Sequence, residues 1–221
     1  VNYYDDQTDN YLQINNQLVI NHIFNRQWSL NSTLFYTYGY GYYNQYRDDA
    51  DLSEYLNLGM SGEADIIRHK LMDNHLAGAN ISANYHKRNI DLTFGGSMSY
   101  YNSPHWGTIS WVDGVEDVGG KWYDNDVVKW DGNIFARADW TLLRGFWDNE
   151  LHLFGDMQYR YVDYRAWGVN DNAVWGDDGT VSMQPIDVDN EYNFFNPRLG
   201  FSYIHHNHNV FASVAVAHRE P

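Results

Sequence analysis

The chain has 221 residues, of which 17% are aromatic and none is cysteine, so it has no disulfide and no thiolate ligand for a metal. Its formal net charge of −15 excludes a nucleic-acid binder, because binding to a phosphate backbone requires a basic surface. No run of 18 apolar residues is present, which excludes a transmembrane helix. This test does not exclude a membrane β-barrel, because the strands of such a barrel alternate apolar residues with polar ones.

Apolar and polar residues alternate with a period of two in eight segments, as they do in strands that have one apolar face. In residues 89–101, for example, Leu92 and Phe94 fall on one face and Asp91 falls on the other. In chain order, the predicted strands cover residues 11–24, 28–43, 75–85, 89–101, 133–142, 150–162, 193–203 and 209–217. This succession predicts an all-β fold, an antiparallel up-and-down meander of about eight long strands.

The predicted connections alternate in length. Four short turns alternate with three connections of about 30 residues, which cover residues 44–74, 102–132 and 163–192. Compact soluble domains have a median connection of about 4–6 residues, whereas outer-membrane barrels combine short turns at one edge with long extracellular loops at the other. The three long segments hold 20 of the 29 acidic residues. We therefore expect function to be concentrated at that edge.

Aromatic residues mark both ends of the apolar stripes. Trp28 and Tyr85 lie at the short-turn end, and Tyr38 and Tyr100 lie at the other end. The segment from Trp28 to Tyr38 extends about 33 Å as a strand, or about 25 Å in height at a tilt of about 40°, which matches the apolar band of a membrane barrel. Amphipathic rings settle where lipid tails meet headgroups. The pattern thus favours contact with lipid over contact with a second sheet.

Three segments resemble the barrel of TonB-dependent outer-membrane receptors. They are HLFGDMQYRYVDY (152–164), FNPRLGFSY (195–203) and VFASVAVAHREP (210–221). A fourth segment, YYNQYRDD (42–49), resembles the start of an extracellular loop of that family. The ending AHREP is the most specific of these matches, and the plan of strands and loops extends the resemblance to nearly the whole chain.

The resemblance implies a 22-stranded barrel filled by an N-terminal plug domain, which imports a scarce ligand with energy transmitted by TonB. Residues 1–221 would then be a partial barrel, a single-domain fragment in the bacterial outer membrane without the plug domain and the remaining strands. The implied partners are outer-membrane lipid, lipopolysaccharide, a small-molecule ligand and, through the absent plug domain, the TonB complex. The ligand would be a siderophore, haem, cobalamin or an oligosaccharide.

Six of the nine tryptophans fall in the three predicted long loops. They are Trp106, Trp111, Trp122, Trp130, Trp167 and Trp175. Because aromatic residues line many concave ligand sites, we expect these six to form a vestibule that captures the imported ligand by stacking. The alternative is that they pack within the loops or touch lipopolysaccharide.

Two other groups of residues carry possible metal ligands, but we expect neither to bind a metal. The acidic residues around Asp48 and Asp187 offer the oxygen atoms that Ca²⁺ prefers, yet no EF-hand spacing is present. The run HHNH at 205–208 places three imidazoles in a short turn. No nucleophile motif, P-loop or dinucleotide fingerprint is present, so we predict a non-enzyme without a cofactor.

Three other functions stay open. The chain could be a self-contained eight-stranded outer-membrane barrel that acts as an anchor or adhesin. It could instead be a soluble β-sandwich that binds carbohydrate with its tryptophans. An outer-membrane hydrolase is the third alternative, although no paired catalytic spacing is found in the sequence.

Overall fold

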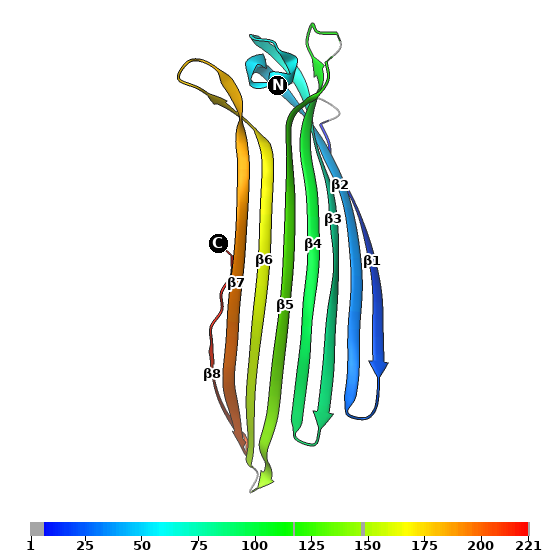
Figure 1. The fold of residues 1–221 in the computed structure, drawn as a ribbon, viewed down its shortest axis with the longest axis vertical. Coiled ribbons are helices and arrows are strands. Elements are labelled where there is room, and N and C mark those ends of the chain that lie inside the picture. The colour runs from blue at the N-terminus through cyan, green and yellow to red at the C-terminus, as the bar shows by residue number, and fades with distance from the viewer. Residues whose placement is uncertain (1–6, 117, 147–148, 221) are drawn as a thin grey trace.

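The computed structural model describes residues 7–116, 118–146 and 149–220. They form one antiparallel sheet in the order β1 to β8, in which each strand pairs with its neighbours in the sequence (Figure 1). The strands are β1 (Asp9–Ile23), β2 (Trp28–Asp51), β3 (Glu63–Lys87), β4 (Ile90–Val112), β5 (Lys121–Phe146), β6 (Asn149–Trp175), β7 (Val181–His205) and β8 (His208–Ala215). The predicted all-β up-and-down meander is confirmed. No helix in the described part of the chain is long and apolar enough to cross a membrane.

The long strands extend well beyond their predicted bounds at one end of the sheet. The connections at this end cover only residues 52–62, 113–120 and 176–180. They are longer than turns such as residues 88–89 at the opposite end, as predicted, but the expected length of about 30 residues is wrong. The additional strand residues lie beyond the apolar band. Backbone pairing continues there without an apolar stripe that the sequence pattern could reveal.

The register of the strands joins the eight predicted stripes into one apolar band. Ala136 of β5 pairs with Phe94 of β4 and with Met157 of β6. Leu199 of β7 pairs with Val214 of β8, so the apolar face continues onto the last strand. Because side chains alternate between the two faces of a sheet, this register places the apolar side chains of all eight strands on the same face.

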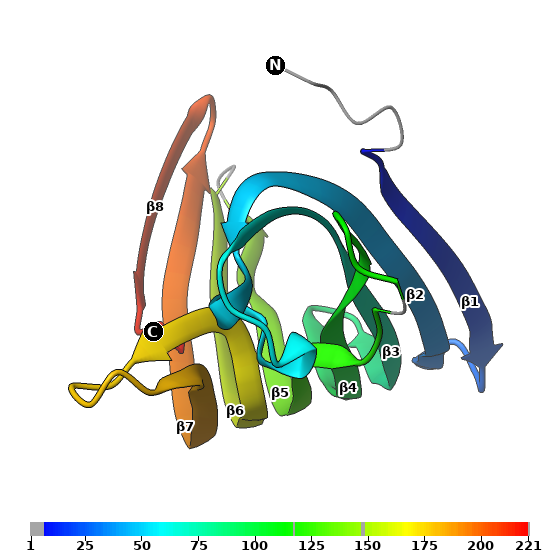
Figure 2. The ribbon, with the colours of Figure 1, turned by 90° about the horizontal axis from the view of Figure 1, so that it is seen from above.

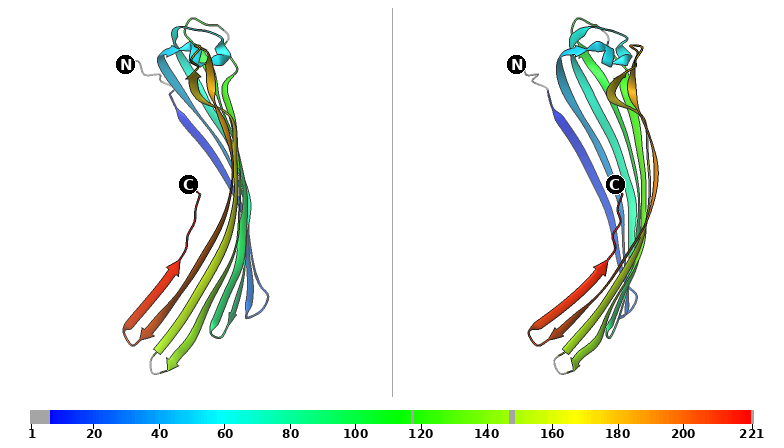
Figure 3. Two further views of the ribbon diagram at one scale, coloured as in Figure 1. Left: turned by 60° about the vertical axis from the view of Figure 1, so that its left-hand side comes forward. Right: turned by 90° about the vertical axis from the view of Figure 1, so that its left-hand side faces the viewer.

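The described residues form a single curved layer, and no second sheet covers the apolar band. Ile134 is 67% exposed and Leu199 is 64% exposed. Seen from above, the sheet curves around a hollow side, over which the cyan segment after β2 folds (Figure 2). The C-terminal tail lies on that hollow side as well (Figure 3). The apolar band therefore occupies the convex face, and the polar residues of the strands occupy the concave face.

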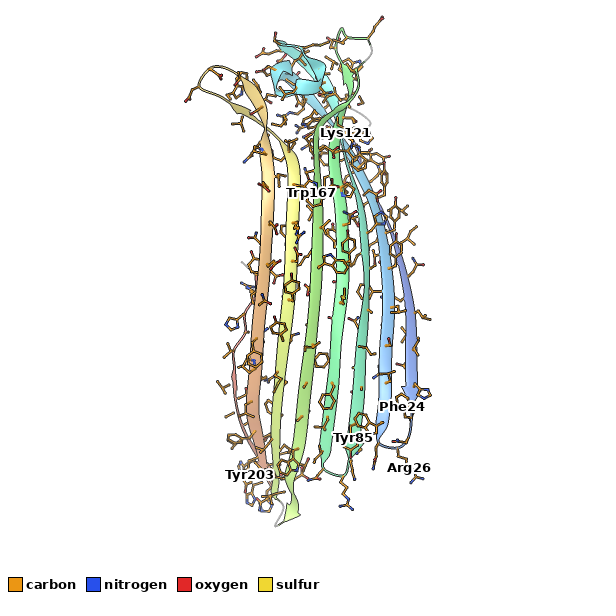
Figure 4. The ribbon with its side chains drawn as sticks, in the orientation of Figure 1. Phe24, Arg26, Tyr85, Lys121, Trp167 and Tyr203 are labelled. Carbon is orange, nitrogen blue, oxygen red and sulfur yellow. The ribbon has the colours of Figure 1, made fainter. Side chains whose placement is uncertain are left out.

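Aromatic residues lie at both ends of the band. At the short-turn end, the ring centroids of Trp28 and Tyr85 are 4.8 Å apart on neighbouring strands. At the other end, those of Tyr100 and Trp130 are 4.6 Å apart. Figure 4 shows Tyr85 and Tyr203 close to the short turns. These positions match the two aromatic rims that the sequence predicts.

On the concave face, several aromatic residues lie opposite a glycine of the neighbouring strand. A Cβ added to each of these glycines would come within 2.3–2.5 Å of the facing ring, so the rings lie over the glycine backbone. The pairs are Phe35 with Gly78, Phe135 with Gly95, and Phe154 with Gly200. This arrangement lets large rings pack flat on the sheet, and the concave face stays open.

The end of the sheet opposite the short turns carries the one hydrophobic cluster of buried residues in the described part of the chain. We call this cluster the cap. It includes the two 3-10 turns η1 (Leu52–Glu54) and η2 (Leu56–Leu58), which follow β2. Its buried members are Ala50, Leu52, Tyr55, Ile66, Ile109, Val112, Trp122, Tyr123 and Met183. Because Met183 belongs to β7, the cap joins segments that are distant in the order of the sheet.

Candidate ligand-binding site

A pocket of about 220 Å³ lies on the concave face beside the cap. Its concave-side lining consists of Asp9, Tyr11, Gly41, Tyr43, Lys70, Met72, His105 and Tyr123. The register explains why these residues meet. Tyr43 pairs with Lys70, and Gly107 pairs with both Lys70 and Tyr123. The pocket is therefore built on rigid strands that rise above the apolar band.

Two glycines make room for the rings of this pocket. A Cβ on Gly41 would come within 2.7 Å of the Tyr11 ring, and a Cβ on Gly107 would come within 2.3 Å of the Tyr123 ring. The pocket thus repeats the pairing of a glycine with an aromatic ring that is found lower on the concave face. A larger residue at either glycine would push a ring into the pocket.

Lys70 is the cation of the pocket, and its side chain is only 13% exposed. Its Nζ lies 5.7 Å from the ring centroid of Tyr43, 5.8 Å from that of Trp122 and 5.9 Å from that of Tyr123. An ammonium group at this distance from aromatic rings is held by cation–π attraction, which strengthens as water is excluded.

Lys70 also forms an ion pair with Asp171, which comes from the far side of the sheet. Asp171 lies in an irregular part of β6, where the pairing with β7 shifts between Val169 and Ala173. The irregularity brings Asp171 across the concave face to a strand three positions away in the sheet. The ion pair therefore links the two halves of the capped end.

The pocket offers several hydrogen-bond donors beside aromatic surfaces. Burial raises the pKa of the Tyr123 hydroxyl above its ordinary value, so this group remains a neutral donor at physiological pH. His105, Tyr11 and Tyr43 add an imidazole and two further phenols. Together with the Lys70 ammonium, these groups suit a ligand that combines aromatic rings with negatively charged or phenolic oxygen atoms.

Trp122 is the one predicted site residue that lies close to this pocket. It is 3% exposed and packs edge-on against Tyr55, with ring centroids 5.2 Å apart. Its indole N–H is buried without a hydrogen-bond partner. Trp122 thus belongs to the cap and supports the pocket lining from behind.

The other five predicted tryptophans lie elsewhere, so the structure does not bring the six into one vestibule. Trp106, Trp130 and Trp167 lie on the convex face, by the register of their strands. Trp130 belongs to the upper aromatic rim, and the upper position of Trp167 is seen in Figure 4. Trp111 and Trp175, near strand ends, are 39% and 53% exposed. All six lie on strands rather than in loops, and their contact with a ligand stays a prediction.

Part of the predicted acidic region forms a compact carboxylate group. Asp48, Asp49 and Asp65 have oxygen atoms within 4.8 Å of one another, the only such potential metal-ligand group within the described residues. Tyr46 donates a hydrogen bond from its hydroxyl to Asp65. This bond, together with one from the Asp49 backbone N–H, lowers the pKa of Asp65, whereas the negative charges of Asp65 and Asp49 raise the pKa of Asp48.

The histidine run lies in the turn between β7 and β8, at the opposite end of the molecule from the cap. The rings of His205 and His206 have centroids 4.2 Å apart, and the Nδ1 atom of His205 is 2.7 Å from the Asn149 side-chain oxygen. Within the ranges that the structure describes, these imidazoles do not converge with other side chains on a shared metal position.

Charged residues on the concave face, at the level of the upper aromatic rim, pair with one another. The guanidinium group of Arg160 donates to Asp131 and to Glu220, and the ammonium of Lys129 donates to Glu220 at 3.0 Å. Glu220 belongs to the tail after β8, which crosses the concave face. Arg160 and Asp131 lie on the neighbouring strands β6 and β5, and these charges face away from the apolar band.

The residues of the pocket were not singled out from the sequence. Tyr43 is the last residue of the second predicted strand and falls on its polar face, which is the one available signal. Lys70 and Tyr123 lie in segments predicted to be loops, and Asp171 is brought to Lys70 only by the irregularity in β6.

No family model and no curated protein matches the sequence. Solved structures of the ferric-catecholate import receptor Fiu from E. coli K12 do match the fold. With the open form, the TM-score is 0.64 at 14% identity, over 98% of this chain and 37% of that chain. With the closed form, it is 0.61 at 15% identity, over 96% of this chain and 33% of that chain. The chain thus spans about a third of the receptor, and the resemblance to part of a TonB-dependent receptor barrel is confirmed.

Proposed function

We propose that this chain forms part of the barrel wall of an outer-membrane receptor that imports an iron–siderophore complex, with the pocket around Lys70 as part of the ligand-binding surface. The observation that carries the proposal is the combination of two faces on one sheet. The convex face carries an apolar band of membrane height. The concave face carries a capped aromatic pocket beyond that band, in which Lys70 is paired with Asp171.

The fold shared with a ferric-catecholate import receptor supports this class of ligand over haem, cobalamin or an oligosaccharide. The chemistry of the pocket agrees with it. A ferric-catecholate complex presents aromatic rings and carries negative charge on its phenolate oxygens. Tyr43 and Tyr123 offer stacking surfaces, and the Lys70 ammonium, which is paired with Asp171, offers N–H donors for phenolate oxygens.

In this proposal the plug domain and the other strands belong to the same receptor, and import depends on the TonB complex. The two edge strands support further pairing, because β1 pairs only with β2 and β8 pairs only with β7 among the described residues. An open edge in hydrocarbon leaves backbone groups unsatisfied at a cost of several kcal/mol each. The receptor class also supports transport rather than an enzymatic function.

The test is uptake of iron-55 by the native bacterium and by a strain that lacks the gene. We expect the deletion to abolish uptake of ferric catecholates and to spare ferric hydroxamates, cobalamin and haem. Complementation with the Tyr43→Ala or Lys70→Met variant should restore only part of the uptake. Unchanged catecholate uptake after the deletion, or loss of cobalamin, haem or oligosaccharide uptake instead, would refute the proposal.

Trp122 enters the proposal as a residue that positions the pocket lining. Trp122→Ala should weaken the affinity for the ferric catecholate, because the cap would no longer support Lys70 and Tyr123. Trp167→Ala provides the comparison on the opposite face. Equal affinities of the two variants and the unmodified protein, measured by quenching of tryptophan fluorescence, would remove Trp122 from the site.

A further inference from the structure

The convex face of β2 and β3 stays aromatic above the apolar band. Tyr38, Tyr40, Tyr42 and Tyr46 alternate along β2 on the same face as the apolar residues below them. They extend the aromatic surface by about 26 Å beyond the rim of the band. We call these four residues, with His69 and His75 of β3, the outer tyrosine ladder.

The rings of the ladder are held by one another. The centroid of the Tyr38 ring is 5.3 Å from that of His75, and the Tyr36 hydroxyl is 2.8 Å from the Nδ1 atom of His75. Tyr42 meets His69 edge-on at 4.9 Å. Contacts between neighbouring strands thus fix the rings of an outward surface that no part of the described chain covers. A preorganised surface binds a partner at a lower entropic cost.

The ladder offers polar groups without a strong charge. Burial lowers the pKa of His69, so its imidazole is neutral at physiological pH, although its Nε2 atom is itself buried without a hydrogen-bond partner. The tyrosine hydroxyls add donors and acceptors along the edge of each ring. The surface therefore suits a partner that has flat apolar faces and carries many hydroxyl groups.

The neighbouring sector of the convex face has the opposite character. Above the band, β5, β6 and β7 present six carboxylates together with Arg165 and Lys121, of which Lys121 pairs with Asp124 at 2.7 Å. The carboxylates are Asp124, Asp126, Asp163, Asp187, Asp189 and Glu191. Arg165 is shared between Asp163 at 3.0 Å and Asp189 at 3.5 Å, so the sector keeps a negative charge. An anionic partner would be repelled from this sector. The ladder has Asp73 opposite Tyr40, and at its upper end Tyr46 is bonded to Asp65, which lies close to Asp48 and Asp49.

The position of the ladder limits what can reach it. The ladder begins at the upper aromatic rim and continues the lipid-facing surface in the same register. A partner on it must therefore extend outward from the membrane surface, next to the lipid tails that cover the band below. Sugar rings have apolar C–H faces that stack on aromatic rings and hydroxyls that reach the polar groups beside them.

We propose that the outer tyrosine ladder binds the saccharide portion of an outer-leaflet glycolipid, whose acyl chains lie on the apolar band beneath it. This inference does not rest on the proposed import function. It assigns the convex face of β2 and β3 to a lipid-borne sugar, while import would use the concave face.

The test compares two probes on the detergent-solubilised receptor by native mass spectrometry. The sugar-bearing probe is lipopolysaccharide with its core sugars, and the other probe is lipid A, which lacks the core sugars and keeps only its own acylated disaccharide. We expect the sugar-bearing form to bind about tenfold more tightly, since two stacked rings add about 1.4 kcal/mol. The double variant Tyr40→Ala/Tyr42→Ala should remove this difference. Tyr40→Phe/Tyr42→Phe should keep most of it, because the rings remain.

Tyr43→Ala is the matched control, because Tyr43 follows Tyr42 on β2 and points to the opposite face. It should preserve the preference for the sugar-bearing probe and weaken only the ferric catecholate. The variant Tyr40→Ala/Tyr42→Ala should lose the preference for the sugar-bearing probe and keep its affinity for the ferric catecholate. The retained affinity shows that this variant folds. Equal binding of the two probes to the unmodified receptor, or an equal loss in Tyr43→Ala, would overturn the inference. Dimerisation that depends on Tyr40 and Tyr42 would assign the ladder to a second copy and overturn it as well.

Discussion

The ring of Phe35 lies directly over Gly78, its partner across the β2–β3 register, so that a Cβ at Gly78 would be 2.4 Å from the ring and 2.6 Å from the Met98 carbonyl oxygen. The ring therefore occupies the space that a side chain would need. Neither neighbour can give way easily, because one is packed on the concave face and the other is backbone.

Replacement of Gly78 by alanine should destabilise the sheet by about 1–3 kcal/mol through overpacking. Gly132→Ala is the matched control, because its nearest atom would be 3.8 Å from the added Cβ. Urea unfolding in lipid vesicles measures both. Similar free energies of unfolding for the two variants would show that the Phe35 ring does not need the glycine.

The alternation of faces predicts opposite effects for two adjacent residues of β6. Met157 is 55% exposed on the convex face, within the apolar band, whereas Gln158 lies on the concave face. Met157→Arg should cost about 2–4 kcal/mol in a bilayer, because the charge would face hydrocarbon. Gln158→Arg should be tolerated, because its side chain faces the polar side. Comparable losses in the two variants would contradict contact of the band with lipid.

The buried position of Trp122 predicts a structural effect that the exposed tryptophans lack. Trp122→Ala should lower the stability of the capped end by about 3–5 kcal/mol, as large aromatic truncations in cores do. Hydrogen exchange of residues 52–58 should accelerate, while exchange within the apolar band stays slow. Trp167→Ala, at 45% exposure on the convex face, should leave both unchanged. Unaltered exchange in Trp122→Ala would show that the cap does not depend on this ring.

The bond from Tyr46 to Asp65 predicts a pH dependence at the top of β2 and β3. It raises the pKa of the Tyr46 hydroxyl to about 12 and lowers the pKa of Asp65. A lowered carboxyl pKa in the folded state contributes stability above the unfolded pKa. This contribution is lost as the pH falls through the folded pKa. Protection of the Asp49 amide, which donates to Asp65, should therefore decrease in acid.

The Tyr46→Phe variant removes the hydroxyl and should raise the pKa of Asp65 toward its ordinary value. NMR titration of labelled aspartates in micelles detects this shift. Tyr42→Phe is the control, because Tyr42 lies on the same face of β2 and packs on His69 rather than on Asp65. An unchanged midpoint for Asp65 in Tyr46→Phe would rule out this bond as the cause.

The membrane-facing part of the fold is predictable because one side of each strand meets hydrocarbon. The resulting stripe identified all eight strands, and it placed Leu92 and Phe94 on the apolar face and Asp91 on the opposite face. Beyond the band both faces of the sheet contact water, so no apolar stripe marks the strands there. For this reason β3 was predicted to begin at residue 75 instead of Glu63. The period-two signal ends where the hydrocarbon ends, not where the strand ends.

The candidate site was less predictable for a related reason. Lys70 and Asp171 are 101 positions apart, and they meet only because the sheet curves and β6 departs from regular pairing. The composition of a segment does not report either feature. Tryptophan content pointed to the correct end of the molecule. It did not distinguish the buried Trp122 from Trp130 at the lipid rim.

The register also fixes the slant of the strands. The pairing row that starts at Trp28, on the lower rim, reaches Leu199 on β7, four residues from Tyr203 on the same rim. Four residues span about 13 Å along a strand, and five strand spacings span about 24 Å. The strands are therefore tilted by about 30° from the membrane normal. A solute that follows the concave wall downward along the strands would therefore turn around the axis of the wall as it descends, as along the thread of a screw.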